Sequence, residues 1–268
     1  MSFQPIVPQG GLVGWRFLQA TYDSQNAAFQ KSPVLQRDTA YFEANIGSIT
    51  KAEDLVADRR LMRVALGAFG LQDDINNKAF IQKILESDAN DDDALANRLA
   101  DDRYSALSEA FRLAKGNIPR TILPSFAGEI LTKFRAQEFE LAIGNQDDNM
   151  RVALYAERTL PEMAAAEGSN DAKWFRIMGN PPLRELMETA LGLPSAFGQQ
   201  DIDRQLVEFK DRAQRFFGTN DISELAKPEM MADIIQSYHV KDQIQQGLAM
   251  TRGSIALTLL QSAATFRF

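Results

Sequence analysis

The segment from residue 51 to residue 113 constrains the fold more than any other part of the chain. Three amphipathic patterns follow one another there, with apolar residues three and four positions apart, which is the spacing of one helix face. The breaks carry helix-ending and helix-starting residues: Gly70 predicts a left-handed C-cap, and Asp101 predicts an N-cap. Thr50 and Glu53 have the spacing of a capping box, which predicts a helix start there. The pattern therefore indicates several successive helices.

The rest of the chain repeats this helical spacing and shows no convincing alternation of period two. We predict an all-α fold of about ten helices in a compact multi-helical array. Residues 1–11, rich in Pro, Gly and Gln, predict a flexible N-terminal arm, and residues 12–268 predict a single all-helical domain. With 268 residues, 45% of them hydrophobic, the chain is long enough for one large core or two modest ones.

Two regions, near residues 51–113 and 181–240, resemble each other in outline and predict degenerate pseudo-repeats. Ala-Phe-Gly at 68–70 recurs at 196–198, whereas an Ala-Leu-Gly match between the same regions needs a different offset. An ancient duplication is one explanation. Capping chemistry shared by two helix–Gly–helix units is the other.

The chain is acidic, with a formal net charge of -7, and it has no cysteine. An acidic chain repels phosphate backbones, so nucleic acid is not expected as a partner. The lack of cysteine excludes disulfides, thiolate metal sites and cysteine nucleophiles. The start of the chain lacks the positive region of a secretory signal. No apolar run reaches the roughly 18 residues that a membrane-spanning helix needs, so membrane insertion is not expected.

Few residues carry recognisable reaction chemistry. His239 is the one histidine, and chain order identifies no Ser or Asp partner for it. The ordinary interpretation of such a histidine is a residue on a helix surface or in a C-terminal turn. Asp88, Asn90 and Asp92 have the spacing of the first calcium-loop ligands, but the glycine and glutamate that should follow are missing. An acidic capping loop is therefore the preferred interpretation, with weak calcium binding as the alternative.

Other site signatures are incomplete. Gly10-Gly11 with Gly14 is neither a P-loop nor a dinucleotide fingerprint, because no strand precedes it and no lysine follows at the required position. Glu138 and Glu140 fall on different faces of a predicted helix, and a di-iron site would need two Glu-x-x-His motifs. We assign no catalytic, cofactor-binding or metal-binding residue from the sequence, and no cofactor.

The apolar C-terminal helix has two possible environments. Its apolar residues recur at helical spacing, for example at Ile244, Leu248, Ile255 and Leu259. An apolar end helix ordinarily docks on the core of its own chain, which is the preferred interpretation. It can instead pair between subunits, as in assembled filament proteins whose ends become helical on assembly.

Several phrases of the sequence together resemble one family of bacterial proteins. They are GWRFL at 14–18, DLVADRRL at 54–61, ALGAFGL at 65–71 and LADDRY at 99–104. The family is catalogued as a domain of unknown function, occurs mostly in alphaproteobacteria, and is often encoded among flagellar genes. The resemblance is dense over residues 14–111 and looser over residues 191–217. It implies no catalytic residue, but it favours a structural or assembly role in the flagellum over an enzymatic one.

We therefore expect a non-enzymatic, flagellum-associated structural or accessory protein that acts through protein–protein contacts. Its expected partners are proteins, with flagellar components as candidates, and its oligomeric state stays open. The expected location is the cytoplasm or, after export without a cleavable signal, the flagellum. The alternative is a helical small-molecule-binding domain or an enzyme that uses His239 or a buried carboxylate.

Overall fold

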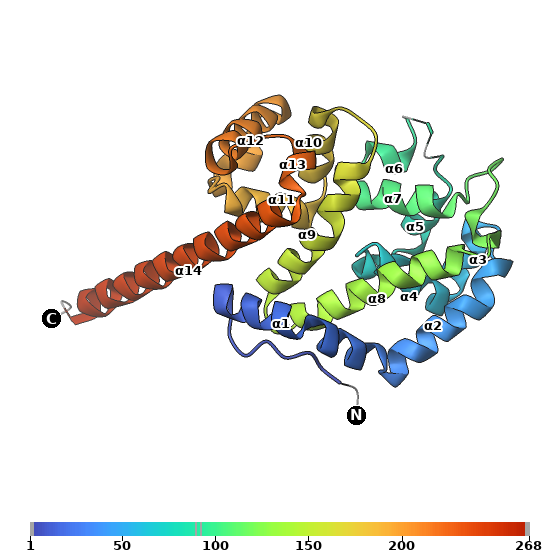
Figure 1. Ribbon diagram of the computed structural model, residues 1–268, viewed down its shortest axis with the longest axis horizontal. Helices are drawn as coiled ribbons and strands as arrows, with labels where there is room; N and C mark the ends of the chain where they lie inside the picture. Colours follow the sequence, from blue (N-terminus) through green and yellow to red (C-terminus); the bar gives the residue numbers. More distant parts are fainter. Residues whose placement is uncertain (1–2, 89, 92, 266–268) are drawn as a thin grey trace.

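The computed structural model describes residues 3–88, 90–91 and 93–265, and over these residues it contains helices and no β-strand (Figure 1). With the 3₁₀ helices included, about 75% of the chain is helical, and the described residues contain fourteen α-helices, of which eleven have seven or more residues. The predicted all-α fold of about ten helices is confirmed. Four short 3₁₀ helices connect some of the α-helices: η1 (Ile46–Ser48), η2 (Gln72–Asn76), η3 (Arg120–Ile122) and η4 (Ser195–Gln199).

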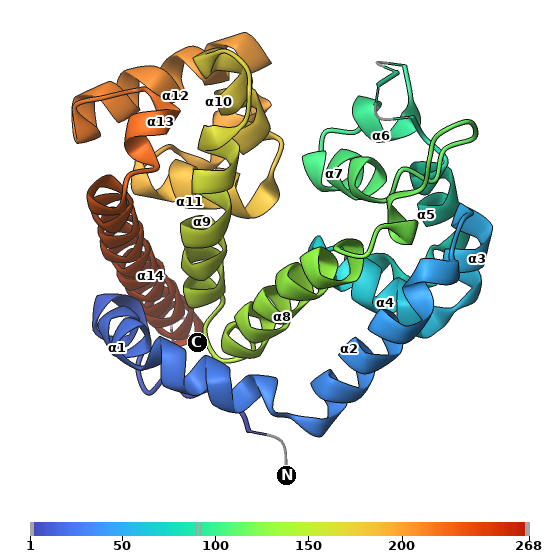
Figure 2. The same ribbon diagram turned by 45° about the vertical axis from the view of Figure 1, so that its right-hand side comes forward.

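The helices form two lobes, each with its own cluster of buried apolar residues. The first lobe contains α2 (Pro33–Asn45), α3 (Ala52–Ala57), α4 (Arg59–Ala68), α5 (Lys78–Leu85), α6 (Leu95–Arg98), α7 (Asp102–Phe111) and the first half of α8 (Phe126–Gly144). The second lobe contains α1 (Gly11–Gln30), the end of α8, α9 (Asp148–Ala165), α10 (Asn170–Met178), α11 (Pro181–Ala190), α12 (Ile202–Phe217), α13 (Ile222–Leu225) and the start of α14 (Pro228–Thr265). Figure 2 shows the lobes side by side, with α8 and α9 forming a V between them.

Helix α8 belongs to both lobes. Phe126 and Phe134 are buried in the cluster of the first lobe, whereas Phe139 and Ile143 are buried in that of the second. In the first lobe α4 packs closely on α8, because Gly67 lies against the ring of Phe134; a Cβ atom at position 67 would lie 2.8 Å from Phe134 Cε2. The two clusters are therefore joined through one continuous helix.

The helix boundaries confirm two of the three predicted caps. Gly70 has φ of 69°, the left-handed conformation expected of a C-cap glycine. Asp101 accepts a hydrogen bond from the backbone N–H of Arg103 and begins α7. The capping box at Thr50 is wrong: α3 begins one residue later, with Lys51 at its N-cap and no side-chain hydrogen bond to the first turn.

The two regions predicted as pseudo-repeats share one local backbone motif. At the end of α4, Leu71 N–H donates to Leu66 O, and at the end of α11, Leu193 N–H donates to Glu188 O. Both are the six-to-one bond of a Schellman motif, and each motif has a left-handed glycine, Gly192 in the second case, followed by a 3₁₀ helix. Superposing Gly70 on Gly192 aligns the two regions with an offset that differs from those of the Ala-Phe-Gly match and the Ala-Leu-Gly match. Descent from a duplication stays a prediction.

Helix α14 docks on the second lobe only at its start. Met231, Ile234, Ile235 and Tyr238 are buried, whereas residues 243–247 are exposed. Beyond this point the helix continues away from the lobes as far as residue 265 (Figure 1). Docking of the whole C-terminal helix on its own core is therefore not observed. Among the described residues, no helix has the length and apolar character needed to cross a membrane.

The segment before α1, predicted as a flexible arm, is described from residue 3 onward. It runs alongside α1, and Pro5 is buried while Val7 packs on the core of the second lobe. The flexibility of the arm, like the single-domain organisation of residues 12–268, stays a prediction.

Candidate functional site

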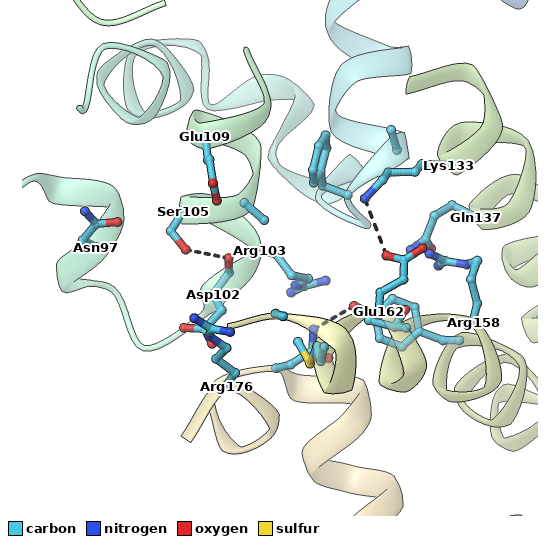
Figure 3. Close-up of a pocket in the computed structure, with 18 of the residues that line it drawn as sticks. Asn97, Asp102, Arg103, Ser105, Glu109, Lys133, Gln137, Arg158, Glu162 and Arg176 are labelled. Carbon is cyan, nitrogen blue, oxygen red and sulfur yellow. Dashed lines mark hydrogen bonds and ion pairs between the residues drawn. The ribbon is translucent and has the colours of Figure 1, made fainter. Parts of the chain in front are cut away.

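A polar groove of about 660 Å³ lies between the two lobes. Its walls come from α7, α8, α9 and α10, and its polar lining residues point toward one another from both sides (Figure 3). A second cavity, of about 430 Å³, shares Arg103, Gln137 and Tyr155 with the groove. These three side chains therefore form the partition between the two cavities.

On the first lobe, Arg103 donates hydrogen bonds to two acceptor groups. Its Nε and Nη2 atoms donate to the Asp101 carboxylate at 3.0 and 2.7 Å, and its Nη1 donates to the Gly70 carbonyl at 2.6 Å. Burial lowers the pKa of Arg103, but the Asp101 carboxylate outweighs burial and the pKa is raised on balance. The left-handed turn at Gly70 presents its carbonyl to Arg103, so the C-cap of α4 positions a groove residue.

Asp102, the first residue of α7, lies where the lobes touch. Its backbone N–H donates to the Gly179 carbonyl at 3.1 Å. The contact is tight, because a Cβ atom at position 179 would lie 2.9 Å from Asp102 Oδ1. Burial, and then the neighbouring Asp101 carboxylate, raise the pKa of Asp102 to about 6, while Arg176 acts in the opposite direction.

On the α8–α9 side, Glu140 and Arg158 form a buried ion pair. Arg158 Nε donates to Glu140 Oε1 at 2.8 Å and Nη2 donates to Oε2 at 3.1 Å, with the Glu140 side chain 4% exposed. With its amide oxygen toward Arg158, Gln137 accepts from that guanidinium at 2.9 Å and donates to Glu140 at 3.3 Å. Burial raises the pKa of Glu140 more than Arg158 lowers it. The ion pair therefore joins α8 to α9.

Tyr155 completes this wall. Its hydroxyl accepts a 2.7 Å hydrogen bond from Asn180 Nδ2, and the Arg158 guanidinium lies 5.2 Å from the centre of its ring. Burial raises the pKa of Tyr155. Asn180 also caps α11 by accepting from Leu183 N–H, so one side chain connects the groove to the start of α11.

One carboxyl group of the groove, that of Asp102, has a pKa well above its ordinary value. Arg103 and Arg158 are each paired with a carboxylate, whereas Asp102 makes no ion pair with any described residue. A carboxyl group with a pKa near 6 can exchange a proton near neutral pH or accept a hydrogen bond from a bound ligand. No group of three or more His, Cys, Asp or Glu residues in the described part of the chain is arranged to hold a metal ion.

His239 is far from a surface position and is absent from the lining of the groove. It is a fully buried residue of α14, with its ring 5.5 Å from that of Trp15 on α1 and 5.3 Å from that of its chain neighbour Tyr238. Neither ring nitrogen has a hydrogen-bond partner among the described residues. Burial lowers the pKa of His239 to about 4. The prediction of a surface or C-terminal-turn residue is wrong, and no described residue lies beside this histidine as an acid–base partner.

The acidic loop behaves locally as a capping loop as far as it is described. Asp88 Oδ1 accepts from the backbone and the side chain of Asn90, and the first of these bonds is the main cause of the lowered pKa of Asp88. Asp92 lies outside the described residues. Glu138 and Glu140 face different partners, Arg63 and Arg158, which confirms that they lie on different faces of α8.

Sequence reasoning did not find the groove. Asp102 and Arg103 fall within a phrase that carries the family resemblance, but the partners that define their environment, Gly70 and Gly179, are far away in the chain. Glu140 and Arg158 are 18 residues apart on two helices, so no local spacing connects them. The one available signal was the run of polar residues at the start of α7.

Three comparisons place the chain among known proteins. The model of a family described as "Protein of unknown function (DUF1217)" matches residues 68–231, which include every residue named above as lining the groove. A crystal structure of a structural-genomics protein from Agrobacterium tumefaciens is similar, with a TM-score of 0.72 and 24% sequence identity. The similarity covers 90% of this chain and 99% of that one, and at this identity it concerns the fold. No curated protein matches significantly.

Proposed function

We propose that this chain, which belongs to the DUF1217 family of proteins of unknown function, is a non-enzymatic structural or accessory protein of the flagellum that acts through protein–protein contacts. The observation that carries the proposal is the course of α14. The helix leaves the second lobe after residue 242 and continues for more than twenty residues (Figure 1). A helix that extends beyond its own core is suited to contact another protein.

The composition of this segment supports the same role. Residues 243–268 carry only two charged side chains, Arg252 and Arg267, and many apolar residues at helical spacing. Where α14 leaves the lobe, Val240 and Ile244 are 39% and 56% exposed. Apolar surface that the chain does not cover itself is typical of a site that another protein covers. The flagellum is proposed as the setting from the resemblance of residues 14–111 to proteins encoded among flagellar genes.

The test is deletion of the gene, with motility, filament assembly and the location of a tagged copy as readouts. We expect impaired swimming or assembly, restored by the full chain but not by a chain ending at Gly247. Ile255→Asp with Leu259→Asp should also fail to restore motility. Thr258→Asp with Gln261→Asp is the matched control, since it adds the same charge to the same helix at positions that are polar in the natural chain. Normal swimming and normal filaments, with the protein confined to the cytosol, would contradict the flagellar role.

A second candidate function is the binding of a small molecule in the groove between the lobes. The specific observation is the acid Asp102, whose pKa is raised to about 6 at the edge of a cavity of about 660 Å³. Thermal-shift screening against a panel of small metabolites tests it. A ligand of the groove should stabilise the natural chain and lose its effect with Ala106→Trp, which fills the groove. Lys115→Trp, at an exposed position away from the groove lining, is the control. A panel that stabilises neither protein would count against this function.

A further inference from the structure

A third cavity, of about 350 Å³, lies on the first lobe where α2, α4 and η2 meet. It shares no lining residue with the groove between the lobes. Its volume falls within the range of about 300–1,000 Å³ that is typical of small-molecule sites. The lining is unexpected in an acidic chain, because half of its residues are arginines: Asp38, Arg59, Arg60, Arg63, Gln72 and Ile75.

The Arg60 guanidinium is held in place by uncharged groups. Its Cζ atom lies 3.8 Å from the centre of the Tyr41 ring, and its Nη2 donates to the Arg37 carbonyl at 3.2 Å. The ring is fixed in turn, because the Tyr41 hydroxyl donates to Asp58 at 2.7 Å. The Asp38 carboxylate is 3.8 Å from Arg60 Nη2, which is beyond hydrogen-bond distance. A guanidinium stacked in this way keeps N–H groups at its edge available for an anion.

The other two arginines of the cavity differ in their partners. Arg59 Nη1 donates to the amide oxygen of Asn76 at 3.1 Å, and Arg59 forms no ion pair with any residue that the structure describes. Arg63 instead donates to Asp38 at 2.6 Å and to Glu138 at 3.3 Å. Arg63 therefore compensates the one acid of the lining, and Arg59 is left with a neutral partner.

Two guanidinium groups, those of Arg59 and Arg60, thus line one cavity without a hydrogen-bonded carboxylate. Their two positive charges match a phosphate monoester, which carries close to two negative charges at neutral pH and three acceptor oxygens. The net charge of -7 does not oppose this match, because charges more than about 8 Å away are largely screened at physiological ionic strength. A long polyanion such as nucleic acid would also meet the acidic surface, so a small ligand fits better.

We propose that this arginine cavity binds the phosphate group of a small phosphorylated molecule. Arg59 and Arg60 donate to the phosphate oxygens, and Arg63 keeps the charge of Asp38 compensated. Ile75 and the aliphatic stems of the arginines contact the rest of the ligand. The site is distinct from the groove, and the proposal goes beyond the flagellar role and stands without it.

Isothermal titration calorimetry of the full chain with phenyl phosphate tests the site, with the ionic strength held constant. Phenyl sulfate is the matched probe, because it has a similar shape and one negative charge. We expect phenyl phosphate to bind about tenfold more tightly, since its second charge engages the second guanidinium. Equal affinity for the two probes, or no binding of phenyl phosphate at millimolar concentration, would overturn the proposal.

Two substitutions locate the binding. Arg59→Gln and Arg60→Gln should each weaken the binding of phenyl phosphate about tenfold, the loss expected for one charge-assisted hydrogen bond. Arg204→Gln is the matched control, because it removes the same charge from an exposed position on α12 of the second lobe. Ala106→Trp, which fills the groove, should also leave the affinity unchanged. An equal loss in either of these two controls would contradict binding in the arginine cavity.

A lipid headgroup offers the same phosphate chemistry, so vesicles distinguish the two sources. The protein should stay in the supernatant when phosphatidylcholine vesicles containing phosphatidic acid are sedimented. Sedimentation with these vesicles that depends on Arg59 and Arg60, without binding of phenyl phosphate, would overturn the small-molecule ligand. Neither calorimetry nor sedimentation depends on the motility test, so this proposal and the flagellar role fail separately.

Discussion

The backbone N–H of Asp102 donates to the carbonyl of Gly179 at 3.1 Å, and this contact brings the half-buried Asp102 carboxyl between the two lobes. The closeness of Gly179 limits the room for water around the carboxyl. The lobes are therefore joined beside an acid that is more easily protonated than usual, and the stability of the protein should depend on its charge.

We expect Asp102→Asn to raise the free energy of unfolding at pH 7. The folded pKa, about 6, lies above the ordinary value of 3.8, so the folded chain binds a proton more tightly than the unfolded chain. In the natural protein this group makes stability increase as pH falls from about 6 toward 3.8. The neutral amide carries no charge that must be held out of water. The free energy of unfolding should therefore rise by about 1–2 kcal/mol, after allowance for the remaining solvent contact. Urea unfolding at pH 7 measures this change. A variant less stable than the natural protein would contradict the raised pKa of Asp102.

His239 should act in the opposite direction. Its folded pKa, about 4, lies below the ordinary value of 6.5, so between these values the unfolded chain binds the proton more tightly. Stability contributed by the neutral imidazole is full above pH 6.5 and is lost as pH falls toward 4, by up to about 3 kcal/mol. His239→Leu, which cannot be protonated, should abolish this loss. Urea midpoints measured from pH 7 to pH 4 test it, and an unchanged slope would show that the ring is not titrating in this range.

The two titrations overlap and act in opposite directions, so the contributions of Asp102 and His239 to stability should partly cancel between pH 4 and 6. Relative to the natural protein, Asp102→Asn should lose more stability as pH falls from 6 to 4, and His239→Leu should lose less. The pH dependence of the double variant should lie between those of the two single variants. Each test compares the slope of stability against pH in a variant with the same slope in the natural protein. No absolute free energy of unfolding is therefore needed.

Glu140→Ala should cost about 3 kcal/mol, because it leaves the Arg158 guanidinium without the carboxylate that it faces across the V. The matched control joins the same two helices. Lys133 and Glu162 lie 3.7 Å apart with side chains 42% and 54% exposed, so Lys133→Ala should change stability by less than about 0.5 kcal/mol. Chemical denaturation of both variants tests the contrast. Similar losses at the two sites would mean that the burial of Glu140 does not determine the strength of its pair.

Gly70→Ala and Gly192→Ala should each destabilise the protein by about 1–2 kcal/mol, the cost of a left-handed non-glycine residue. Both positions have room for a methyl group, so backbone strain should account for the loss. Gly128 is the control: it lies inside α8, with open space where its Cβ would be, and Gly128→Ala should stabilise the helix by about 0.5–1 kcal/mol. Thermal unfolding of the three variants should therefore give shifts of opposite sign.

What could be predicted from the sequence was mainly local. The left-handed turn at Gly70 and the cap at Asp101 depend on a few neighbouring residues, so their chemistry is visible in the chain. Thr50 shows that even local chemistry is conditional, because its capping box has the right residues and does not form. The similarity between the two regions was partly visible in the sequence. The two sequence matches require two different offsets, however, and the Schellman motifs at Gly70 and Gly192 require a third.

The groove could not be predicted, because it exists only once the lobes are placed against each other. The raised pKa of Asp102 depends on burial beside Gly179, and the Glu140–Arg158 pair depends on the angle between two helices. The environment of His239 also depends on tertiary packing. This histidine stands in a polar stretch, Ser-Tyr-His-Val-Lys, and is buried because α1 packs over that face of α14. Side-chain type alone does not determine such surroundings.

The passage of α8 through both hydrophobic clusters has a consequence for how the protein folds. Melting one lobe would remove the partners of Phe134 or of Ile143 and fray the helix on which the other lobe is built. Loss of structure should therefore propagate along α8, and the whole chain should unfold in a single cooperative transition rather than lobe by lobe. Amide protons in the middle of α8 should then be among the slowest in the protein to exchange with solvent.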